Sequence, residues 1–213
     1  MLSARPDPGS TGPLGWYLRL VLHYVERGPF LVVEDGELLR RLTDHGPASG
    51  VAETEAGAER MRARAPGCPV HLGPGAVPSE SFHGIAAFDV LARGGDDGGT
   101  AAQWARILEP GGRAIVLVPD PGGRGRTLTR GEWAGERPGN RTHDEWRALF
   151  TGVGLTVHRE GSDGLTRGPY GRIPTLLDPR TAPARTQQSI GSLFLNPGEG
   201  ENAVFVLEKP TPS

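Results

Sequence analysis

The chain has very little cysteine, no long apolar run and almost no excess charge. Cys68 is the only cysteine, which excludes an internal disulfide framework and a zinc site built from several cysteines. No stretch approaches the roughly 20 consecutive apolar residues of a membrane span, and no secretory leader opens the sequence. The net charge of −2 gives no electrostatic reason to bind nucleic acid or an anionic membrane. We therefore expect a cytoplasmic protein whose partner is a small-molecule substrate.

Familiar catalytic and cofactor fingerprints are missing as well. The sequence contains no G-x-S-x-G nucleophile motif, no P-loop and no dinucleotide fingerprint. His71 and His83 fall in or near strand ends, without a spacing that would bring several metal ligands together, so we expect no metal site. Glycine and proline are abundant and lower the hydrophobic fraction to 36%. Apolar runs still recur at regular intervals, which predicts an ordered domain.

The most informative stretch is Ala101–Pro119. Trp104 and Ile107 fall three residues apart on what the pattern predicts to be an amphipathic helix. Pro110–Gly112 should end this helix, because proline cannot continue it and glycine accepts the left-handed closing conformation. The apolar run Ala114–Val118 then predicts a strand that is covered on both faces.

Helices and strands alternate along the rest of the chain. We expect residues 1–15 to be a disordered arm and residues 16–213 to form a single domain. The expected helices are Trp16–Glu26, Glu37–His45, Glu53–Ala65, Thr100–Leu108 and Thr142–Thr151, the last with a capping box between Thr142 and Glu145. The expected strands are Phe30–Glu34, Ser49–Ala52, Pro69–Leu72, Ile85–Ala92, Ala114–Val118, Leu155–Glu160 and Asn202–Glu208. This order predicts an α/β fold with a doubly wound, Rossmann-like sheet of about seven strands, mostly parallel, with a C-terminal antiparallel hairpin and three αβα layers.

Two segments resemble a known family. ILEPGGRAIVLVPD is similar to the L-x-P-G-G-x-h-h-h-x-h-P segment of class I S-adenosylmethionine (SAM) methyltransferases, where h is apolar. THDEWRALFTGVGLTVHREGSDGL resembles the family's late helix and strand, and Gly154 stands at the family's glycine before the sixth strand. The likeness runs from about Trp16 to Pro210 and implies the same fold, with SAM as the cofactor where the family's site is kept.

The resemblance places SAM outside the carboxyl ends of the strands, at three positions. The first is a glycine-rich loop after the first strand, h-h-D-h-G-C-G-x-G, whose backbone approaches the methionine part of SAM. Here Glu34, Asp35 and Gly36 follow the strand, so one glycine remains and the loop is shorter by about two or three residues. The two acidic side chains would repel the carboxylate of the cofactor.

The second and third positions also depart from the family. Ala52 stands where an acid would hold the ribose hydroxyls, and Glu53 would serve only if the strand slipped by one residue, which turns a side chain to the opposite face. Pro74 stands where an aspartate would contact the adenine amino group, and it has neither a carboxylate nor a backbone donor. We therefore expect a degenerate SAM site and no cofactor, with SAM as the cofactor only if methyltransferase activity survives.

Four residues are candidates for catalysis at the same edge of the sheet. Glu34 follows the first strand, Asp120 follows the fifth, and Trp133 lies in the long polar loop after Asp120. His143 begins the next helix beside acidic residues and could exchange protons near neutral pH. The alternative for His143 is a solvated helix start, at which acidic neighbours are favoured by the helix dipole.

Three functions remain open. The first is SAM-independent chemistry, such as cyclisation or rearrangement of a small metabolite in biosynthesis, on a repurposed methyltransferase fold. The second is an active SAM-dependent small-molecule methyltransferase with an unusual pocket. The third is a non-catalytic partner that stabilises or regulates an active relative through the apolar helix Trp16–Val25, a surface that would also suit a homodimer.

Overall fold

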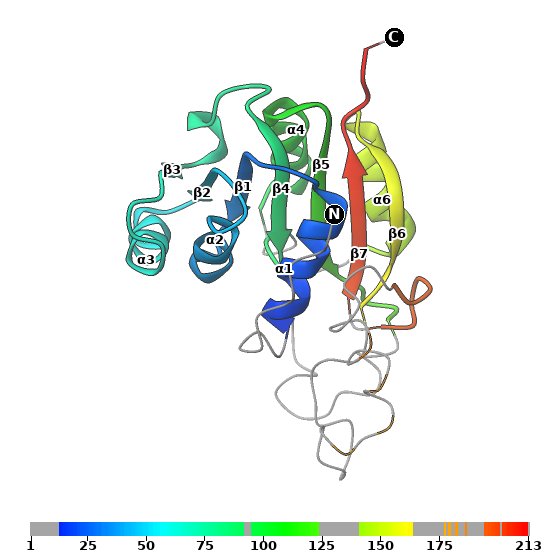
Figure 1. Cartoon of the computed structure of the whole chain (residues 1–213). Helices are drawn as coiled ribbons and strands as arrows, with labels where there is room; N and C mark the ends of the chain where they lie inside the picture. The colour runs from blue at the N-terminus through cyan, green and yellow to red at the C-terminus, as the bar shows by residue number, and fades with distance from the viewer. Residues whose placement is uncertain are drawn as a thin grey trace.

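A seven-stranded sheet runs through the middle of the molecule, with helices on both faces (Figure 1). The computed structural model describes residues 13–91, 95–123, 141–163, 194–200 and 202–212, together with residues 177, 179, 182 and 186. The helices are α1 (Pro13–Tyr24), α2 (Gly36–Leu42), α3 (Glu55–Arg64), the short 3₁₀ helix η1 (Pro74–Ala76), α4 (Asp97–Ile107) and α6 (His143–Gly152). The strands are β1 (Phe30–Val33), β2 (Ala48–Ala52), β3 (Val70–Leu72), β4 (Phe82–Phe88), β5 (Leu108–Pro119), β6 (Thr156–Ser162) and β7 (Asn202–Glu208).

The strand order across the sheet is β3-β2-β1-β4-β5-β7-β6. The first five strands in the chain pair in parallel, whereas β7 pairs antiparallel with both β5 and β6. The order therefore reverses between β1 and β4, so the carboxyl ends of these two neighbouring strands flank the switch point of the sheet. The predicted fold class, including the antiparallel C-terminal pair, is confirmed.

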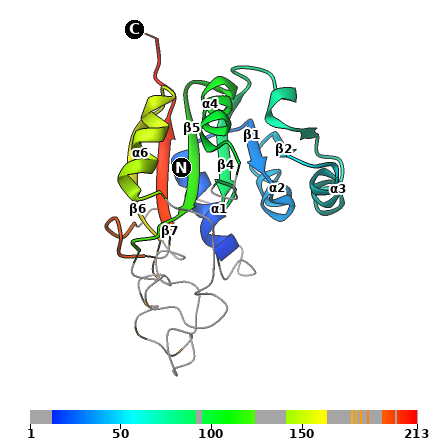
Figure 2. The ribbon, with the colours of Figure 1, turned by 180° about the vertical axis from the view of Figure 1, so that it is seen from behind.

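Alternation of side chains along the strands creates two cores. On one face α1, α2 and α3 pack on residues such as Val32, Ala86 and Leu117. On the other face, seen from behind in Figure 2, α4 and α6 pack on residues such as Val116 and Phe205. Strands buried on both faces explain the continuous apolar runs in the sequence.

Most element ends lie within three residues of the prediction, and two strands differ by more. The strand expected at Ile85–Ala92 ends at Phe88, because Asp89 adopts a left-handed conformation with φ 56° that cannot continue a strand. The expected turn at Pro110–Gly112 does not end the preceding helix, which already stops at Ile107.

The Pro-Gly-Gly segment instead forms an irregularity inside β5. Phe82 pairs with Leu108 and Gly84 with Arg113, so the residues between are bulged out of the β4–β5 ladder. Gly111, at φ 78°, donates its backbone N–H to the Lys209 carbonyl at 2.8 Å. The glycine therefore serves the join between β5 and the chain after β7 rather than a helix end.

The apolar helix near the N-terminus belongs to the core. It begins at Pro13, so the expected boundary of the arm at residue 15 lies inside α1, and residues 1–12 lie outside the described part. Trp16, Leu20 and Val21 are at most 1% exposed because they pack on the sheet. The apolar surface that this helix leaves open is therefore smaller than the sequence suggests, and a dimer through it stays a prediction. No helix within the described ranges is long and apolar enough to cross a membrane.

Candidate functional site at the switch point of the sheet

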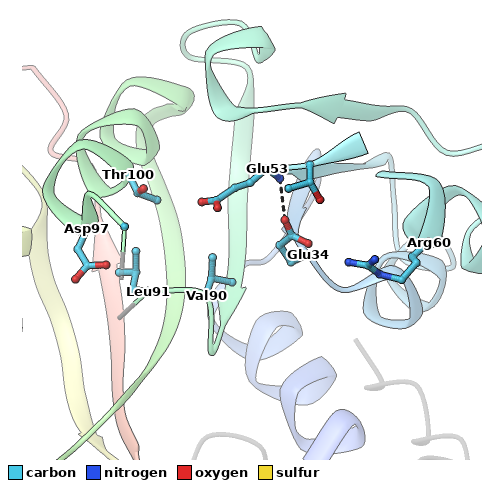
Figure 3. Close-up of a pocket in the computed structure, with 9 residues that line it drawn as sticks. Glu34, Glu53, Arg60, Val90, Leu91, Asp97 and Thr100 are labelled. Carbon is cyan, nitrogen blue, oxygen red and sulfur yellow. Dashed lines mark hydrogen bonds between the residues drawn. The ribbon is translucent and has the colours of Figure 1, made fainter. Parts of the chain in front are cut away.

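A pocket of about 390 Å³ opens between the carboxyl ends of β1, β2 and β4 and the start of α4 (Figure 3). Its position at the switch point is where ligands bind in open α/β sheets. Its volume falls within the range of small-molecule sites, about 300–1,000 Å³. The lining residues are Glu34, Glu53, Thr54, Arg60, Val90, Leu91, Gly95, Asp97 and Thr100.

Glu34 connects two walls of the pocket. It is the first residue after β1 and has φ 61°, a left-handed conformation that is unfavourable for a residue with a side chain. Its Oε1 accepts a hydrogen bond of 2.7 Å from the backbone N–H of Glu53, and its other oxygen lies against Gly57 in the first turn of α3. Non-glycine residues in this conformation are concentrated at functional sites. Glu34 therefore fixes the corner after β2 at the rim of the pocket.

Glu53 is the residue directly after β2, and its side chain lines the pocket. Ala52, the last strand residue, is buried at 1% exposure. The strict alternation assumed from the sequence does not apply to Glu53, because the chain has already left the strand at this residue. An acidic side chain thus reaches the pocket from the end of β2 without any slip in register.

Asp35 and Gly36 serve the helix that follows rather than the pocket. Asp35 is the N-cap of α2, and its Oδ1 accepts from the backbone N–H groups of Glu37 at 3.0 Å and Leu38 at 2.9 Å. A Cβ on Gly36 would lie 2.8 Å from the Cβ of Arg64, so the missing side chain lets α2 approach α3. Neither residue lines the pocket.

Pro74 lies away from the pocket as well. It opens η1, and its carbonyl accepts from Arg106 Nη2 at 3.0 Å. The same nitrogen also donates to the carbonyl of Val77 at 2.8 Å, so Arg106 ties η1 to α4. Within the described residues, Pro74 therefore has a structural role.

The far wall of the pocket is formed after β4 and at the start of α4. The left-handed turn at Asp89 directs the chain so that Val90 and Leu91 become an apolar surface of the pocket. Asp97, only 6% exposed, forms an ion pair with Arg141. Because the Arg141 guanidinium also lies 5.0 Å from the ring centre of Trp146, this pair connects the pocket wall to α6.

Of the two other catalytic candidates, the structure describes only Asp120, which does not line this pocket. Asp120 follows β5, is 4% exposed, and accepts from the backbone N–H of Gly122 at 3.0 Å. Trp133 lies outside the described residues. Their catalytic roles stay predictions.

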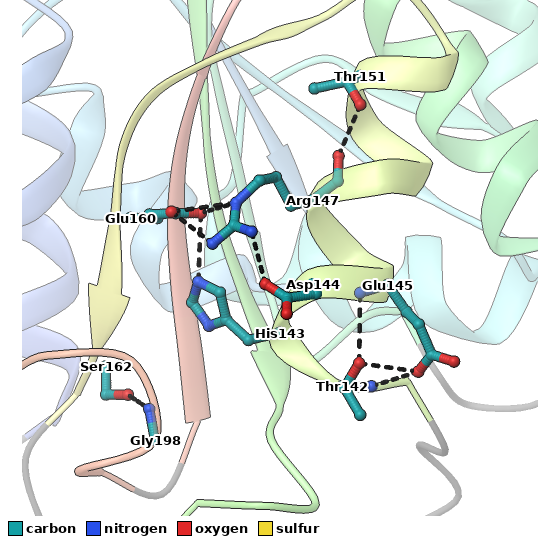
Figure 4. A network of polar contacts seen from close by, with 9 residues as sticks. All are labelled: Thr142, His143, Asp144, Glu145, Arg147, Thr151, Glu160, Ser162 and Gly198. Atoms are coloured by element: carbon teal, nitrogen blue, oxygen red, sulfur yellow. Dashed lines mark hydrogen bonds and ion pairs between the residues drawn. The ribbon is translucent and has the colours of Figure 1, made fainter.

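His143 lies in a separate polar cluster between α6 and β6 (Figure 4). It is 9% exposed, its Nε2 lies 3.3 Å from Glu160 Oε2, and its ring centre lies 4.6 Å from that of Phe205. Arg147 clamps the same carboxylate with two N–H groups, Nε at 2.8 Å and Nη2 at 2.7 Å. His143 is therefore buried inside the domain rather than solvated at a helix start, and it does not line the pocket.

The charges in this cluster stabilise one another. Burial by itself raises the pKa of Glu160, but hydrogen bonds and charge from Arg147, with His143 as a lesser contributor, outweigh it and hold that pKa below its usual range. Hydrogen bonds to Glu160 raise the pKa of Arg147 further above its ordinary value. The capping box between Thr142 and Glu145 is confirmed, and the backbone N–H of Thr142 lowers the pKa of Glu145.

Most of the pocket was not evident from the sequence. Among the residues predicted for the cofactor site, Glu34 and Glu53 line the pocket, whereas Asp35, Gly36 and Pro74 do not. The unpredicted lining residues are Thr54, Arg60, Val90, Leu91, Gly95, Asp97 and Thr100. All of them except Arg60, which lies in the middle of α3, share one signal of position, since they follow strand ends or lie at or just before the starts of helices α3 and α4.

Solved structures of other proteins show the same fold as this chain. Neither a protein-family model nor a curated protein matches the chain by sequence. A SAM-dependent methyltransferase from Mesorhizobium loti is similar, with a TM-score of 0.64 and 16% identity over 93% of this chain and 99% of that one. A SAM-dependent methyltransferase from Thermotoga maritima has a TM-score of 0.63 at 17% identity, over 92% of this chain and 89% of that one. A TehB-like SAM-dependent methyltransferase from Corynebacterium glutamicum has a TM-score of 0.62 at 14% identity, over 91% and 87%.

The chain has the fold of the class I SAM-dependent methyltransferases. In that fold, the resemblance assigns three contacts to SAM, and the residues present can be tested against each. At the methionine contact, only Glu34 and Asp35 separate β1 from α2, and the Asp35 carboxylate already accepts from the first amides of the helix. At the adenine contact, Pro74 offers no side-chain acceptor and does not line the pocket. The residues fit the ribose contact alone, through Glu53.

Proposed function

We propose that this methyltransferase-fold protein is an enzyme that transforms a small metabolite in the switch-point pocket without ordinary SAM binding. The capping of α2 by Asp35 is the observation that carries the proposal. The Asp35 carboxylate accepts hydrogen bonds from two backbone N–H groups at the start of α2, where the carboxylate of SAM would bind. A second anion at the same place would meet a negative charge, and two amides of the first helical turn already donate to Asp35. Pro74 at the adenine position supports the same conclusion.

The chemistry proposed is a cyclisation or rearrangement. Such reactions need a substrate held in one conformation and one or two groups that move protons. Val90 and Leu91 supply an apolar wall for the carbon skeleton, while Glu34 and Glu53 supply carboxylates that could accept or return a proton. The Glu53 backbone is fixed by Glu34, so the corner that carries this side chain is held in place before a substrate arrives.

Calorimetric titration with SAM and with its demethylated product tests the proposal. We expect no binding tighter than about 100 μM, which corresponds to roughly 5.5 kcal/mol. Tighter binding of either compound would contradict the proposal. If neither binds, incubation of the pure protein with candidate metabolites, followed by mass spectrometry, should reveal conversion to an isomer.

An active SAM-dependent methyltransferase is the second candidate, and Glu53 is the observation that favours it. This acid reaches the pocket from the end of β2, where the resemblance places the ribose-binding carboxylate. On this alternative, Glu53→Ala would abolish SAM binding, whereas Glu59→Ala, at an exposed position of α3, would leave it unchanged. The matched pair of variants separates a genuine ribose contact from a general loss of negative charge.

A further inference from the structure

The pocket carries an unbalanced set of charges. Among the described residues, three carboxylates line it, those of Glu34, Glu53 and Asp97, and Arg60 is the one basic residue. Asp97 is already paired with Arg141. Glu34 and Glu53 form no ion pair with any described residue, and the only hydrogen bond of the Glu34 carboxylate comes from a backbone N–H. Within the described chain these two carboxylates therefore form no ion pair, and Arg60 is the cation that shares the pocket with them.

These two carboxylates line the pocket together with apolar side chains, and Glu53 is also exposed to solvent. They stand on one side of the pocket, across from the apolar wall of Val90 and Leu91 and the hydroxyl of Thr100 (Figure 3). Glu34 is also held in a left-handed backbone conformation, at φ 61°, that a glycine would adopt without strain. Low-dielectric walls around carboxylates of one sign concentrate the electrostatic field and attract a ligand of the opposite sign.

The spacing of the acids favours an organic cation over a metal ion. Within the described ranges, no group of three or more histidine, cysteine, aspartate or glutamate residues is close enough to hold a metal. An organic cation needs no such convergence, because one ammonium group can pair with one carboxylate while its carbon chain lies on an apolar wall.

We propose that the switch-point pocket binds a small organic cation, an amine with one or two ammonium groups, through the carboxylates of Glu34 and Glu53. The inference rests on the proposed function, since it takes the pocket to be the site of a small molecule. Arg60 lowers the affinity of the pocket for cations, because its positive charge offsets that of one of the two carboxylates.

The test compares putrescine, a four-carbon diamine, with butanediol, its neutral counterpart of the same length. Ligand-observed NMR titration at neutral pH and low salt should show putrescine binding at least about tenfold more tightly than the diol. Raising the salt concentration should weaken the binding of the diamine and leave the binding of the diol unchanged, because salt screens only the charged ligand.

Variants with opposite expected effects keep the test independent of folding. Glu53→Gln should weaken the binding of putrescine about tenfold. Glu34→Gln should weaken it by the same factor, while its amide oxygen still accepts the hydrogen bond from the Glu53 N–H. Arg60→Gln should increase the affinity for putrescine several-fold, and a misfolded protein could not show such an increase. Glu59→Gln and Arg64→Gln, at exposed positions of α3 outside the lining, are the controls and should change neither ligand.

Three results would overturn the inference. The first is equal affinity for the diamine and the diol. The second is an equal loss of putrescine affinity in Glu53→Gln and Glu59→Gln, and the third is no detectable binding of putrescine to the unaltered protein. Tight binding of SAM would overturn the proposed function instead, and the comparison of diamine with diol would still decide the charge preference of the pocket.

Discussion

The three residues after β1 have different roles, one at the pocket and two in the packing of the helices. Glu34 faces the pocket, Asp35 caps α2, and Gly36 permits the approach of α2 to α3. The sequence marked all three as one cofactor loop, because their position after the first strand is the family's glycine-rich position. It could not separate them, since the direction of each side chain depends on where α2 begins and on how closely α3 packs.

Gly36→Ala tests the packing role at this scale. The added Cβ would lie 2.8 Å from the Arg64 Cβ and 3.0 Å from the Met61 Cα, so α2 and α3 must move apart. We expect a loss of about 1–3 kcal/mol in the free energy of unfolding, measured by urea denaturation. Gly75→Ala is the control, since a Cβ there meets nothing within 4 Å. Equal effects of the two changes would show that Gly36 is not a contact position.

At the scale of elements, α6 is fastened to β6 by charge as well as by its apolar face. Arg147 on the helix and Glu160 on the strand form the main ion pair, and His143 adds a contact to the same carboxylate. The sequence predicted the helix and its capping box from local spacing. It did not predict the pairing with Glu160, because that contact depends on how the helix lies across the sheet.

Glu160→Gln should reduce stability in a pH-dependent way. Arg147 holds the pKa of Glu160 below its unfolded value, so the pair stabilises the fold above the unfolded pKa of about 4.3, and this contribution is lost as the pH falls through the folded pKa. We expect a deficit of about 1 kcal/mol at neutral pH, since the pair is partly exposed. The deficit should be smaller at pH 3, below the unfolded pKa, and should disappear once the pH has fallen below the folded pKa.

Urea denaturation of both proteins at the two pH values is the measurement. Glu26→Gln, at an exposed position after α1, controls for the general effect of removing one carboxylate. A deficit that is the same at both pH values would mean that packing, and not the ionised pair, is what the substitution removes.

For the whole molecule, α1 links the N-terminal segment to the C-terminal strands. Its side chains pack with Val204 and Val206 of β7, and Arg113 of β5 donates to the carbonyl of Tyr24 at 3.0 Å. The apolar helix is therefore part of the three-layer structure. Its surface was open to two interpretations in the sequence, as core or as interface, because amphipathicity does not say what covers a helix.

Trp16→Ala should reduce the free energy of unfolding by about 3–5 kcal/mol, because the indole is 1% exposed and its removal leaves a cavity in the core. Trp16→Phe should cost less and keeps the protein measurable if the first variant fails to fold. Leu72→Ala, at a side chain that is 49% exposed, is the control. The urea midpoint also tests the predicted dimer, since a midpoint that rises with protein concentration would indicate a contact between copies through α1, and a constant midpoint would contradict it.

The sequence by itself determined the order of elements, the buried parallel strands and the antiparallel pair at the end, because these follow from hydrophobic period and local turn chemistry. It also indicated the edge of the sheet at which a site would lie. Only the tertiary structure decided that Asp35 turns to its own helix, that Glu53 reaches the pocket, and that Asp97 and Arg60 join it. These residues come from separate segments, and their convergence depends on where each strand ends and how the helices pack, which no local pattern records.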